Sequence, residues 1–247
     1  MRSCVIIPAR YSSSRFPGKP LIPLLGKPMI LWVAELSARA VGNSNVYIAT
    51  EDSRIIDQVV NAGFQALKTS SDALTGTDRL AEAAQQIEYD IYLNVQGDEP
   101  LVDPKDIIKV RDTKLSQMDK VINAFCWVSD SEDPHSTNIP KVITNENNEL
   151  IYMSRVALPG FKQSKFSPTS YKKQVCIYAF TKNELNAFSD FGRKSKLEQS
   201  EDIEILRFLE LKKTILMIEA KFGSLAVDVP EDIQKVEDRL THRETNK

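Results

Sequence analysis

Residues 4–50 have the sequence CVIIPARYSSSRFPGKPLIPLLGKPMILWVAELSARAVGNSNVYIAT, and their pattern decides the fold class. Cys4–Pro8 is a short apolar run that predicts a buried strand, Pro28–Val41 has the spacing of an amphipathic helix, and Asn45–Thr50 predicts a second strand. Another helix is expected over Ser53–Ala62. Strands that alternate with helices in this way indicate an α/β fold with a parallel sheet covered by helices.

The alternation continues to about residue 130 and then changes. Further helices are expected over Leu80–Glu88, Asp103–Leu115, Leu197–Leu211 and Asp232–Leu240, and further strands over Asp90–Val95, Lys120–Val128, Val175–Thr181 and Ile215–Glu219. From Ile139 to Arg155, two apolar runs flank the polar turn AsnGluAsnAsn, which predicts a β-hairpin. The tail from His242 to Lys247 is expected to fray. The chain has no internal repeat and no dividing linker, so we expect one domain over residues 1–247.

The loop after the first strand is suited to binding a polyphosphate. It contains several serines together with Arg10, Arg15 and Lys19, and a helix follows it. Backbone N–H groups of such a turn form an anion site, and the three cations would neutralise a leaving pyrophosphate. Neither the Walker A pattern nor G-x-G-x-x-G is present. A basic surface turn is the alternative, and the order of strand, loop, cations and helix favours the phosphate site.

Two acidic segments each have an Asp placed after an apolar run that is expected to be a strand. They are Gln96–Pro100, which contains Asp98, and Val227–Asp232, which contains Asp228. Carboxylates at the carboxyl ends of strands lie where open α/β sheets bind ligands, and two of them could hold Mg²⁺. Asp228 could instead cap the last helix. Together with the phosphate loop, the acidic pair suggests nucleotidyl transfer.

A third segment, Thr75–Arg79, precedes the helix expected from Leu80. Its glycine and small hydroxyl residues permit close approach to a base or ribose. A plain helix cap by Thr77 or Asp78 is an equally good interpretation of these residues alone.

Composition and charge exclude several classes of protein. The formal net charge is −2 and the three cysteines form no C-x-x-C pair. Nucleic-acid and acidic-membrane partners call for clustered excess Lys and Arg, so neither is expected. A disulfide framework and a zinc site are not indicated, and no apolar run is long enough for a signal peptide or membrane span. We expect a cytoplasmic protein.

At this point several runs of residues resemble one known family. CVIIPARYSSSRFPGKPL, GKPMI, TGTDRL, LNVQGDEPL and VDVPEDI occur in order and are similar to motifs of the 3-deoxy-manno-octulosonate cytidylyltransferases, the CMP-Kdo synthetases. The resemblance extends from residue 5 to about residue 240. It implies a nucleotide-diphospho-sugar transferase fold, Rossmann-like, with a mostly parallel sheet and a small hairpin-containing annex for dimerisation and sugar binding.

The resemblance also implies the activity. A homodimer would use CTP and Mg²⁺ to convert an ulosonic acid, with Kdo as the leading acceptor, to its CMP-sugar and pyrophosphate for surface polysaccharide synthesis. Residues up to about 130 would form the nucleotide-binding half, and residues from about 131 to 240 the sugar-acid-binding and dimerisation part.

Individual roles follow from the matched motifs. Arg10, Arg15 and Lys19 would bind the triphosphate, with Arg10, Lys19 and Asp98 as the catalytic set and Asp98 and Asp228 as the magnesium ligands. Thr77, Arg79 and Gln96 would lie near the nucleotide, and Arg155, Gln174, Tyr178 and Glu204 on the sugar-acid side. An Arg suits a carboxylate because its planar fork binds both oxygens. Neither His135 nor His242 falls in a matched motif, so neither is given a catalytic role.

The chain departs from the family in the sugar pocket. Gln174 and Ile205 stand where a His and a Gln would contact the octulosonate hydroxyls. A buried substrate hydroxyl that loses its partner costs on the order of 1–3 kcal/mol, so an amino- or deoxy-substituted ulosonic acid is the close alternative. Retention of Kdo, with Gln174 replacing the hydrogen bond of the His, is also open.

Two functions outside this substrate class also remain open. One is a nucleotidyltransferase that acts on a sugar phosphate with UTP or GTP. The other is a non-catalytic relative that binds nucleotide. The polar stretch Phe161–Lys173 is interpreted as a solvated loop, with a substrate lid as the alternative.

Overall fold

The computed structural model describes residues 1–12, 16–130, 132–221, 225–227 and 229–245. Residues 243–245 are described by their backbone only. A nine-stranded sheet forms the centre of the molecule, with β8 and β9 at its side. Its principal strands run in the order β11-β7-β10-β6-β1-β4-β5. The strand bounds are β1 Ser3–Pro8, β4 Val46–Thr50, β5 Gln65–Lys68, β6 Ile91–Val95, β7 Val121–Trp127, β8 Lys141–Thr144, β9 Leu150–Ser154, β10 Lys172–Phe180 and β11 Ile215–Glu219.

The amino-terminal strands pair as the sequence predicted. β1 is parallel to β4 and to β6, and β4 is parallel to β5. β7 is parallel to β11. The prediction of a mostly parallel sheet is therefore confirmed.

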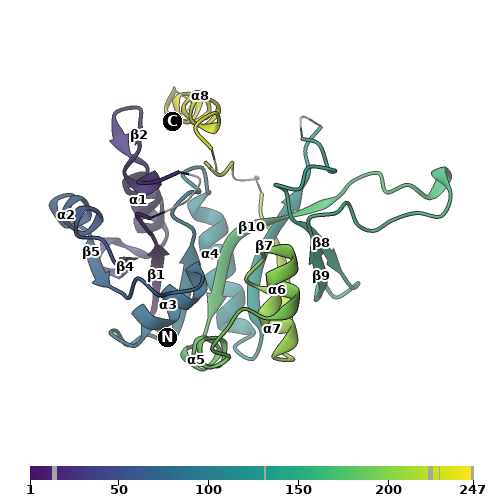
Figure 1. Ribbon diagram of the computed structural model, residues 1–247, viewed down its shortest axis with the longest axis horizontal. Helices are drawn as coiled ribbons and strands as arrows, with labels where there is room; N and C mark the ends of the chain where they lie inside the picture. The colour runs from purple at the N-terminus through teal and green to yellow at the C-terminus, as the bar shows by residue number, and fades with distance from the viewer. Residues whose placement is uncertain (13–15, 131, 222–224, 228, 246–247) are drawn as a thin grey trace.

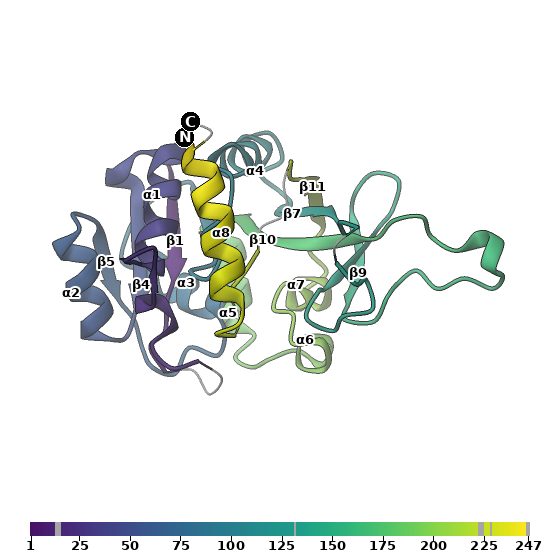
Figure 2. The same ribbon diagram turned by 90° about the horizontal axis from the view of Figure 1, so that it is seen from above.

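Helices cover both faces of this sheet, and Figure 2 shows α1 and α4 on one side of the strands and α5–α7 on the other. Their bounds are α1 Met29–Val41, α2 Ser53–Asn61, α3 Gly76–Ala84, α4 Pro104–Ser116, α5 Lys182–Asp190, α6 Lys196–Glu201, α7 Leu206–Glu210 and α8 Asp232–Thr245. One apolar cluster joins α1, α2 and α4 to the sheet, and a second joins α3, α5 and α7 to its other face. The principal strands contribute side chains to both clusters, because successive side chains of a strand point to opposite faces of the sheet.

Side-chain caps fix where several helices begin. Thr75 accepts a hydrogen bond from the Asp78 amide at the start of α3, and Asp103 accepts one from the Lys105 amide at α4. At α5, Thr181 and Glu184 form a reciprocal capping box. These contacts satisfy backbone N–H groups that have no partner inside the helix.

The antiparallel strand β10 lies between β6 and β7. The sequence predicted this strand but not the strands that pair with it. Its register shifts between Val175 and Tyr178, and the Asn123 amide bridges the irregularity by donating to the carbonyls of Val175 and Ile177 at 3.0 and 2.9 Å. This insertion brings the second half of the chain against the carboxyl end of β6.

The β8–β9 hairpin confirms the expected turn at residues 145–148. The segment that joins β9 to β10 forms an arm that projects from the body of the molecule (Figure 1). The predicted loop Phe161–Lys173 therefore ends two residues early, because Lys172 and Lys173 belong to β10.

Other predicted boundaries are wrong. The helix expected over Leu197–Leu211 is two helices, because Asp202 adopts a left-handed conformation with φ of 51° at the end of α6. The helix expected from Leu80 begins at Gly76, where Thr75 caps it. Residues 225–227 are not a strand, and α8 continues through residues that were expected to fray.

The sequence analysis did not predict β5, α5 or the small hairpin of β2 (Pro23–Leu24) and β3 (Lys27–Pro28). That hairpin lies beside α8 (Figure 1), and Leu24, Trp32 and Val236 belong to a third apolar cluster. Among the helices of the described residues, none is long and apolar enough to cross a membrane.

Candidate active site

The phosphate loop leaves β1 and closes on Tyr11. Arg10 is exposed directly after the strand, and the Gly18 amide donates to the Tyr11 carbonyl at 2.9 Å. Gly18 has φ of 72°, a conformation that favours glycine, and a Cβ there would lie only 3.2 Å from the Tyr11 ring. Lys19 follows at once in a short 3-10 helix, Lys19–Leu21. The loop thus places Arg10 and Lys19 at its two ends; Arg15 lies outside the described residues.

Lys19 and Asp98 meet at the carboxyl end of the sheet. The Lys19 ammonium donates to Asp98 Oδ2 at 2.7 Å, with the two side chains 19% and 28% exposed. The Val227 amide donates to the Asp98 carbonyl at 3.0 Å, which brings the late acidic segment to the same edge. Asp228 itself lies outside the described residues. The structure therefore joins the last of the three predicted phosphate cations, Lys19, to the first acidic motif.

The start of α3 forms a second cluster with Gln96 and Glu204. Glu204 accepts from the Gln96 side-chain amide and from the Thr77 backbone amide, each at 2.9 Å. A Cβ on Gly76 would lie 2.8 Å from Gln96 Nε2, so a larger residue there would displace the Gln96 amide from its present position. Burial raises the pKa of Glu204, and the hydrogen bond from the Thr77 amide opposes that shift. Two predicted nucleotide residues and one predicted sugar residue thus share a contact.

Gln174 and Tyr178 lie next to each other on β10. The Gln174 amide donates to the Tyr178 hydroxyl and to Asn123 Oδ1, both at 3.1 Å. Burial, followed by nearby Cys176 and Glu204, raises the pKa of Tyr178 well above its ordinary value. The phenol therefore stays neutral and can donate to or accept from a sugar hydroxyl.

Two predicted ligand-binding arginines are engaged within the protein. Arg155 donates to the carbonyls of Glu201, Thr137 and Asp202 at 2.5, 2.7 and 3.0 Å. Arg79 is buried, donates to the Thr69 hydroxyl at 2.5 Å and forms an ion pair with Glu51 at 2.8 Å. Their predicted contacts with sugar and nucleotide stay predictions, and each would need these guanidinium groups to exchange partners. His135 and His242 are exposed.

Sequence reasoning missed several charged residues near the site. Glu51 directly follows β4 and lies within the same network as Arg79. The rule that drew attention to Asp98, a carboxylate just past a parallel strand, applies equally to Glu51 and could have found it. Arg207 is fully buried between Asp78 and Glu198, in contacts that only the folded chain creates.

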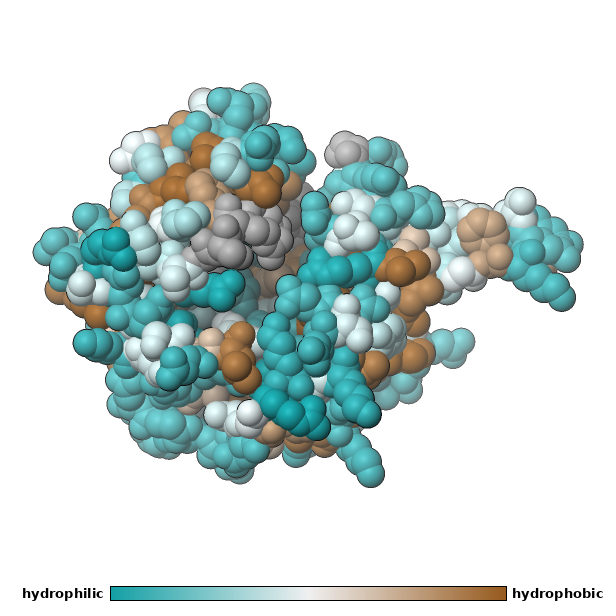
Figure 3. All heavy atoms as spheres, viewed as in Figure 1, coloured by the Kyte–Doolittle hydropathy of each residue, from teal (hydrophilic) through white to brown (hydrophobic). Residues whose placement is uncertain are grey.

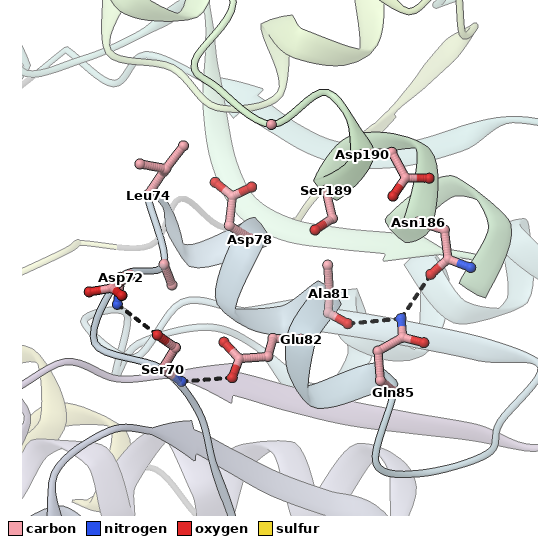
Figure 4. Close-up of a pocket in the computed structure, with 12 residues that line it drawn as sticks. Ser70, Asp72, Leu74, Asp78, Ala81, Glu82, Gln85, Asn186, Ser189 and Asp190 are labelled. Carbon is pink, nitrogen blue, oxygen red and sulfur yellow. Dashed lines mark hydrogen bonds between the residues drawn. The ribbon is translucent and has the colours of Figure 1, made fainter.

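A separate groove of about 640 Å³ lies between α3 and α5 (Figure 4). Its lining includes the carboxylates Asp72, Asp78, Glu82 and Asp190, and none of the described residues that line it is Lys or Arg. An anionic triphosphate would meet unfavourable charge there. The groove therefore does not compete with the Lys19–Asp98 edge as a nucleotide site.

The described residues contain no group of three or more His, Cys, Asp or Glu side chains able to hold a metal ion. Asp98 is the predicted metal ligand that the structure places beside the phosphate loop, where its side chain contacts Lys19. As an oxygen donor it suits Mg²⁺, which is held in many nucleotide sites by one or two carboxylates together with substrate phosphates.

Comparison with known proteins gives consistent matches along the chain. A family model described as cytidylyltransferase matches residues 4–215. The 3-deoxy-manno-octulosonate cytidylyltransferase of Trichlorobacter lovleyi is 40% identical over 97% of this chain and 99% of its own length. The 8-amino-3,8-dideoxy-manno-octulosonate cytidylyltransferase of Shewanella baltica is 37% identical over 97% of this chain and 99% of its own.

A solved structure gives the same result. CMP:2-keto-3-deoxy-manno-octonic acid synthetase complexed with CTP matches with a TM-score of 0.90 and 33% identity, covering 98% of this chain and 100% of that one. This match confirms the fold that the sequence predicted.

Proposed function

Because the chain belongs to the cytidylyltransferase family, we propose that it transfers CMP from CTP to a 3-deoxy-ulosonic acid, with Kdo as the leading acceptor. The observation that carries this proposal is the contact of Lys19 with Asp98 at 2.7 Å. It joins the phosphate loop to the acidic end of β6, where a nucleotidyltransferase needs a cation and a carboxylate together. This enzyme is a nucleotidyltransferase, and its product would enter surface polysaccharide synthesis.

The reaction exchanges one P–O bond for another. The anomeric hydroxyl of the sugar acid forms a bond to the α-phosphorus of CTP, and the bond from that phosphorus to the bridging oxygen breaks to release pyrophosphate. Arg10 and Lys19, at the two ends of the loop, would balance the charge that grows on the leaving group. Gln96 and the start of α3 would hold the nucleotide, while Gln174 and Tyr178 would face the sugar.

Magnesium is part of this proposal. Asp98 would bind it, and Asp228 is the second carboxylate that the sequence supplies. When bound, the ion would neutralise phosphate charge and orient the leaving pyrophosphate. Lys19 would then be released from Asp98 toward the triphosphate.

Pyrophosphate release tests the function directly. The protein is incubated with CTP, Mg²⁺ and Kdo, beside an amino-substituted analogue, a nine-carbon sialic-type acid and a control without sugar. Turnover that requires both CTP and an eight-carbon ulosonic acid supports the proposal. Preference for UTP or GTP with a sugar phosphate would contradict it, and CTP binding without turnover on any acid would indicate a non-catalytic nucleotide-binding protein.

An 8-amino-substituted ulosonic acid is the second candidate acceptor. The charges of Glu204 and Glu99 both act on Tyr178, so the surroundings of that phenol are acidic. An ammonium group on the sugar gains charge-assisted hydrogen bonds from such surroundings, whereas a hydroxyl gains less. The name of the Shewanella baltica relative describes this amino sugar as its substrate.

Gln174→His is expected to shift the choice between these two acids. The Gln174 amide donates to two neighbours, Tyr178 and Asn123. A neutral imidazole has only one N–H, so it could donate to only one of these two neighbours. Its other nitrogen could accept a hydrogen bond from a sugar hydroxyl. We expect the ratio of kcat/KM for Kdo to that for the amino sugar to rise by about tenfold. Gln65→His, on the edge strand β5, is the control; an unchanged ratio would remove Gln174 as a specificity residue.

We also propose that the chain forms a homodimer through the arm and its hairpin. Figure 3 shows hydrophobic side chains at the base of the arm and along it. Ile151, Val156 and Phe166 are 57%, 65% and 64% exposed. Exposed apolar side chains that recur along the hairpin and the arm are typical of a surface that a partner covers.

The double substitution Ile151→Asp and Val156→Asp is expected to convert the dimer to a monomer, because two buried carboxylates per subunit would face an apolar partner. Light scattering after size-exclusion chromatography measures the mass. Val60→Asp on α2, where the side chain is 54% exposed, is the control. A wild-type chain that is monomeric at tens of micromolar would contradict the dimer.

The reaction is assigned to the cytoplasm. All three cysteines, Cys4, Cys126 and Cys176, are free thiols. Free thiols fit a reducing compartment, where disulfides are rare.

A further inference from the structure

Glu51 links the two parts of the nucleotide site. It follows β4 directly, and its side chain is 16% exposed. Its Oε1 accepts from the Tyr11 amide at 3.1 Å, and its Oε2 lies 2.8 Å from Arg79 Nη1. One carboxylate therefore contacts the start of the phosphate loop and the first turns of α3.

Tyr11 holds the phosphate loop closed. Its carbonyl accepts from the Gly18 amide at 2.9 Å, and its ring lies where a Cβ on Gly18 would approach it to 3.2 Å. The Arg54 guanidinium carbon lies over the Tyr11 ring, 3.3 Å from its centroid. Arg10 precedes Tyr11 and Lys19 follows Gly18, so both cations of the described loop depend on where Tyr11 sits.

Arg79 fixes the other side of Glu51. Its guanidinium donates to the Thr69 hydroxyl at 2.5 Å and to the Ser70 carbonyl at 3.2 Å, and its side chain is 5% exposed. Two residues earlier, the Thr77 amide donates to Glu204. The path from Glu204 through α3 and Arg79 to Glu51 and Tyr11 thus joins the base and sugar side of the site to its phosphate side.

Charge supports the same arrangement. Arg10 lies near enough to Arg79 to oppose its charge, while Glu51 and Glu82 favour it. Without Glu51, less negative charge would balance the positive charges of Arg79 and Arg10. The carboxylate therefore both accepts from the Tyr11 amide and offsets the charge of these two arginines.

We propose that Glu51 is a positioning residue that sets the phosphate loop for the triphosphate of the nucleotide. This inference rests on the proposed function for the identity of the nucleotide, CTP. Glu51 acts through the Tyr11 amide and through Arg79 and touches no reacting atom. Because Tyr11 lies between the two cations of the described loop, we expect Glu51 to act on recognition of the β- and γ-phosphates more strongly than on recognition of the base.

Binding of CTP and of CMP to Glu51→Ala and Glu51→Gln tests the proposal. Loss of a charged hydrogen-bond partner is expected to weaken CTP binding by about tenfold in Glu51→Ala, with CMP binding unchanged. Glu51→Gln keeps an oxygen for the Tyr11 amide and should lose less. The control is Glu35→Ala, which removes an exposed partner of Lys27 on α1 at 2.7 Å. If Glu51→Ala does not fold, the Gln variant carries the comparison.

The outcomes separate this proposal from the function itself. Equal losses for CTP and CMP, or no loss for either, would overturn the positioning role, and a lower melting temperature alone would show a structural role only. Inorganic tripolyphosphate serves as a probe without a nucleoside. Weaker tripolyphosphate binding in Glu51→Ala supports the role of Glu51. If the wild-type chain shows no preference for CTP, that finding counts against the proposed function and not against the role of Glu51.

Discussion

Asp98→Asn is expected to reduce turnover by about a thousandfold while the fold stays intact, because removal of one charged group that acts on the transition state costs on the order of 10²–10³ in kcat. Asparagine has the same shape as aspartate but carries no charge. It can neither bind a divalent cation as strongly nor pair with the Lys19 ammonium, which now lies 2.7 Å from Asp98 Oδ2. Pyrophosphate release with saturating CTP and sugar acid measures the effect.

Two controls make this result specific. Asp72→Asn changes an exposed carboxylate of the groove between α3 and α5 and should leave turnover unchanged. Thermal unfolding of Asp98→Asn should match that of the wild type, since Asp98 is partly exposed and its backbone contact with Val227 is retained. Activity within threefold of wild type would show that the carboxylate at the end of β6 does not serve the reaction.

Local sequence signals predicted the first half of the fold and the phosphate side of the site. The run Cys4–Pro8 is apolar at every position and the loop after it contains its cations within a few residues, so nothing distant is needed to interpret it. Asp98 was found because a parallel strand and its carboxyl end can be recognised from a single segment. Lys19 and Asp98 then meet because both follow adjacent parallel strands.

Long-range pairing explains what the sequence could not supply. β10 lies between β6 and β7 in an antiparallel direction, and no short segment encodes that neighbour. Its placement brings Gln174 and Tyr178 to the site. The split of the Leu197–Leu211 helix has a similar origin, because Asp202 adopts its left-handed conformation where Arg155, the residue after β9, donates to its carbonyl.

Arg155 shows that a residue type alone does not fix the partner of a side chain. An Arg on the sugar side was expected to bind a carboxylate, yet its guanidinium donates to three backbone carbonyls. The forked geometry that suits a carboxylate also suits several carbonyls that converge. Only the positions of Thr137, Glu201 and Asp202 in space distinguish the two.

Arg207→Met is expected to destabilise the protein by about 3–5 kcal/mol, because removing one partner of a buried ion pair leaves charge without compensation. Arg207 is fully buried and donates to Glu198 at 2.8 and 2.7 Å and to Asp78 at 2.7 and 3.0 Å. Although burial opposes its charge, these hydrogen bonds raise the pKa of Arg207. At roughly 2–4 °C per kcal/mol for a chain of this size, the melting temperature should fall by roughly 10 °C.

The control for this prediction is Lys194→Met. Its ion pair with Asp202 is 3.0 Å long but 35% and 64% exposed. Exposed pairs contribute only about 0–1 kcal/mol, so its melting temperature should hardly change. Equal shifts in the two variants would mean that the Arg207 cluster is not the strong contact its burial indicates.

A partial rescue would identify uncompensated charge as the cause. In the Arg207→Met background, Glu198→Gln removes the fully buried carboxylate that has lost its partner. We expect this second substitution to recover part of the lost stability, although alone it should destabilise the wild type. We also expect Arg207→Met to weaken CTP binding, and this loss should persist in the double variant. Asp78 joins Arg207 to the Thr75 hydroxyl that caps α3, and no change at Glu198 restores that link to the nucleotide side of the site.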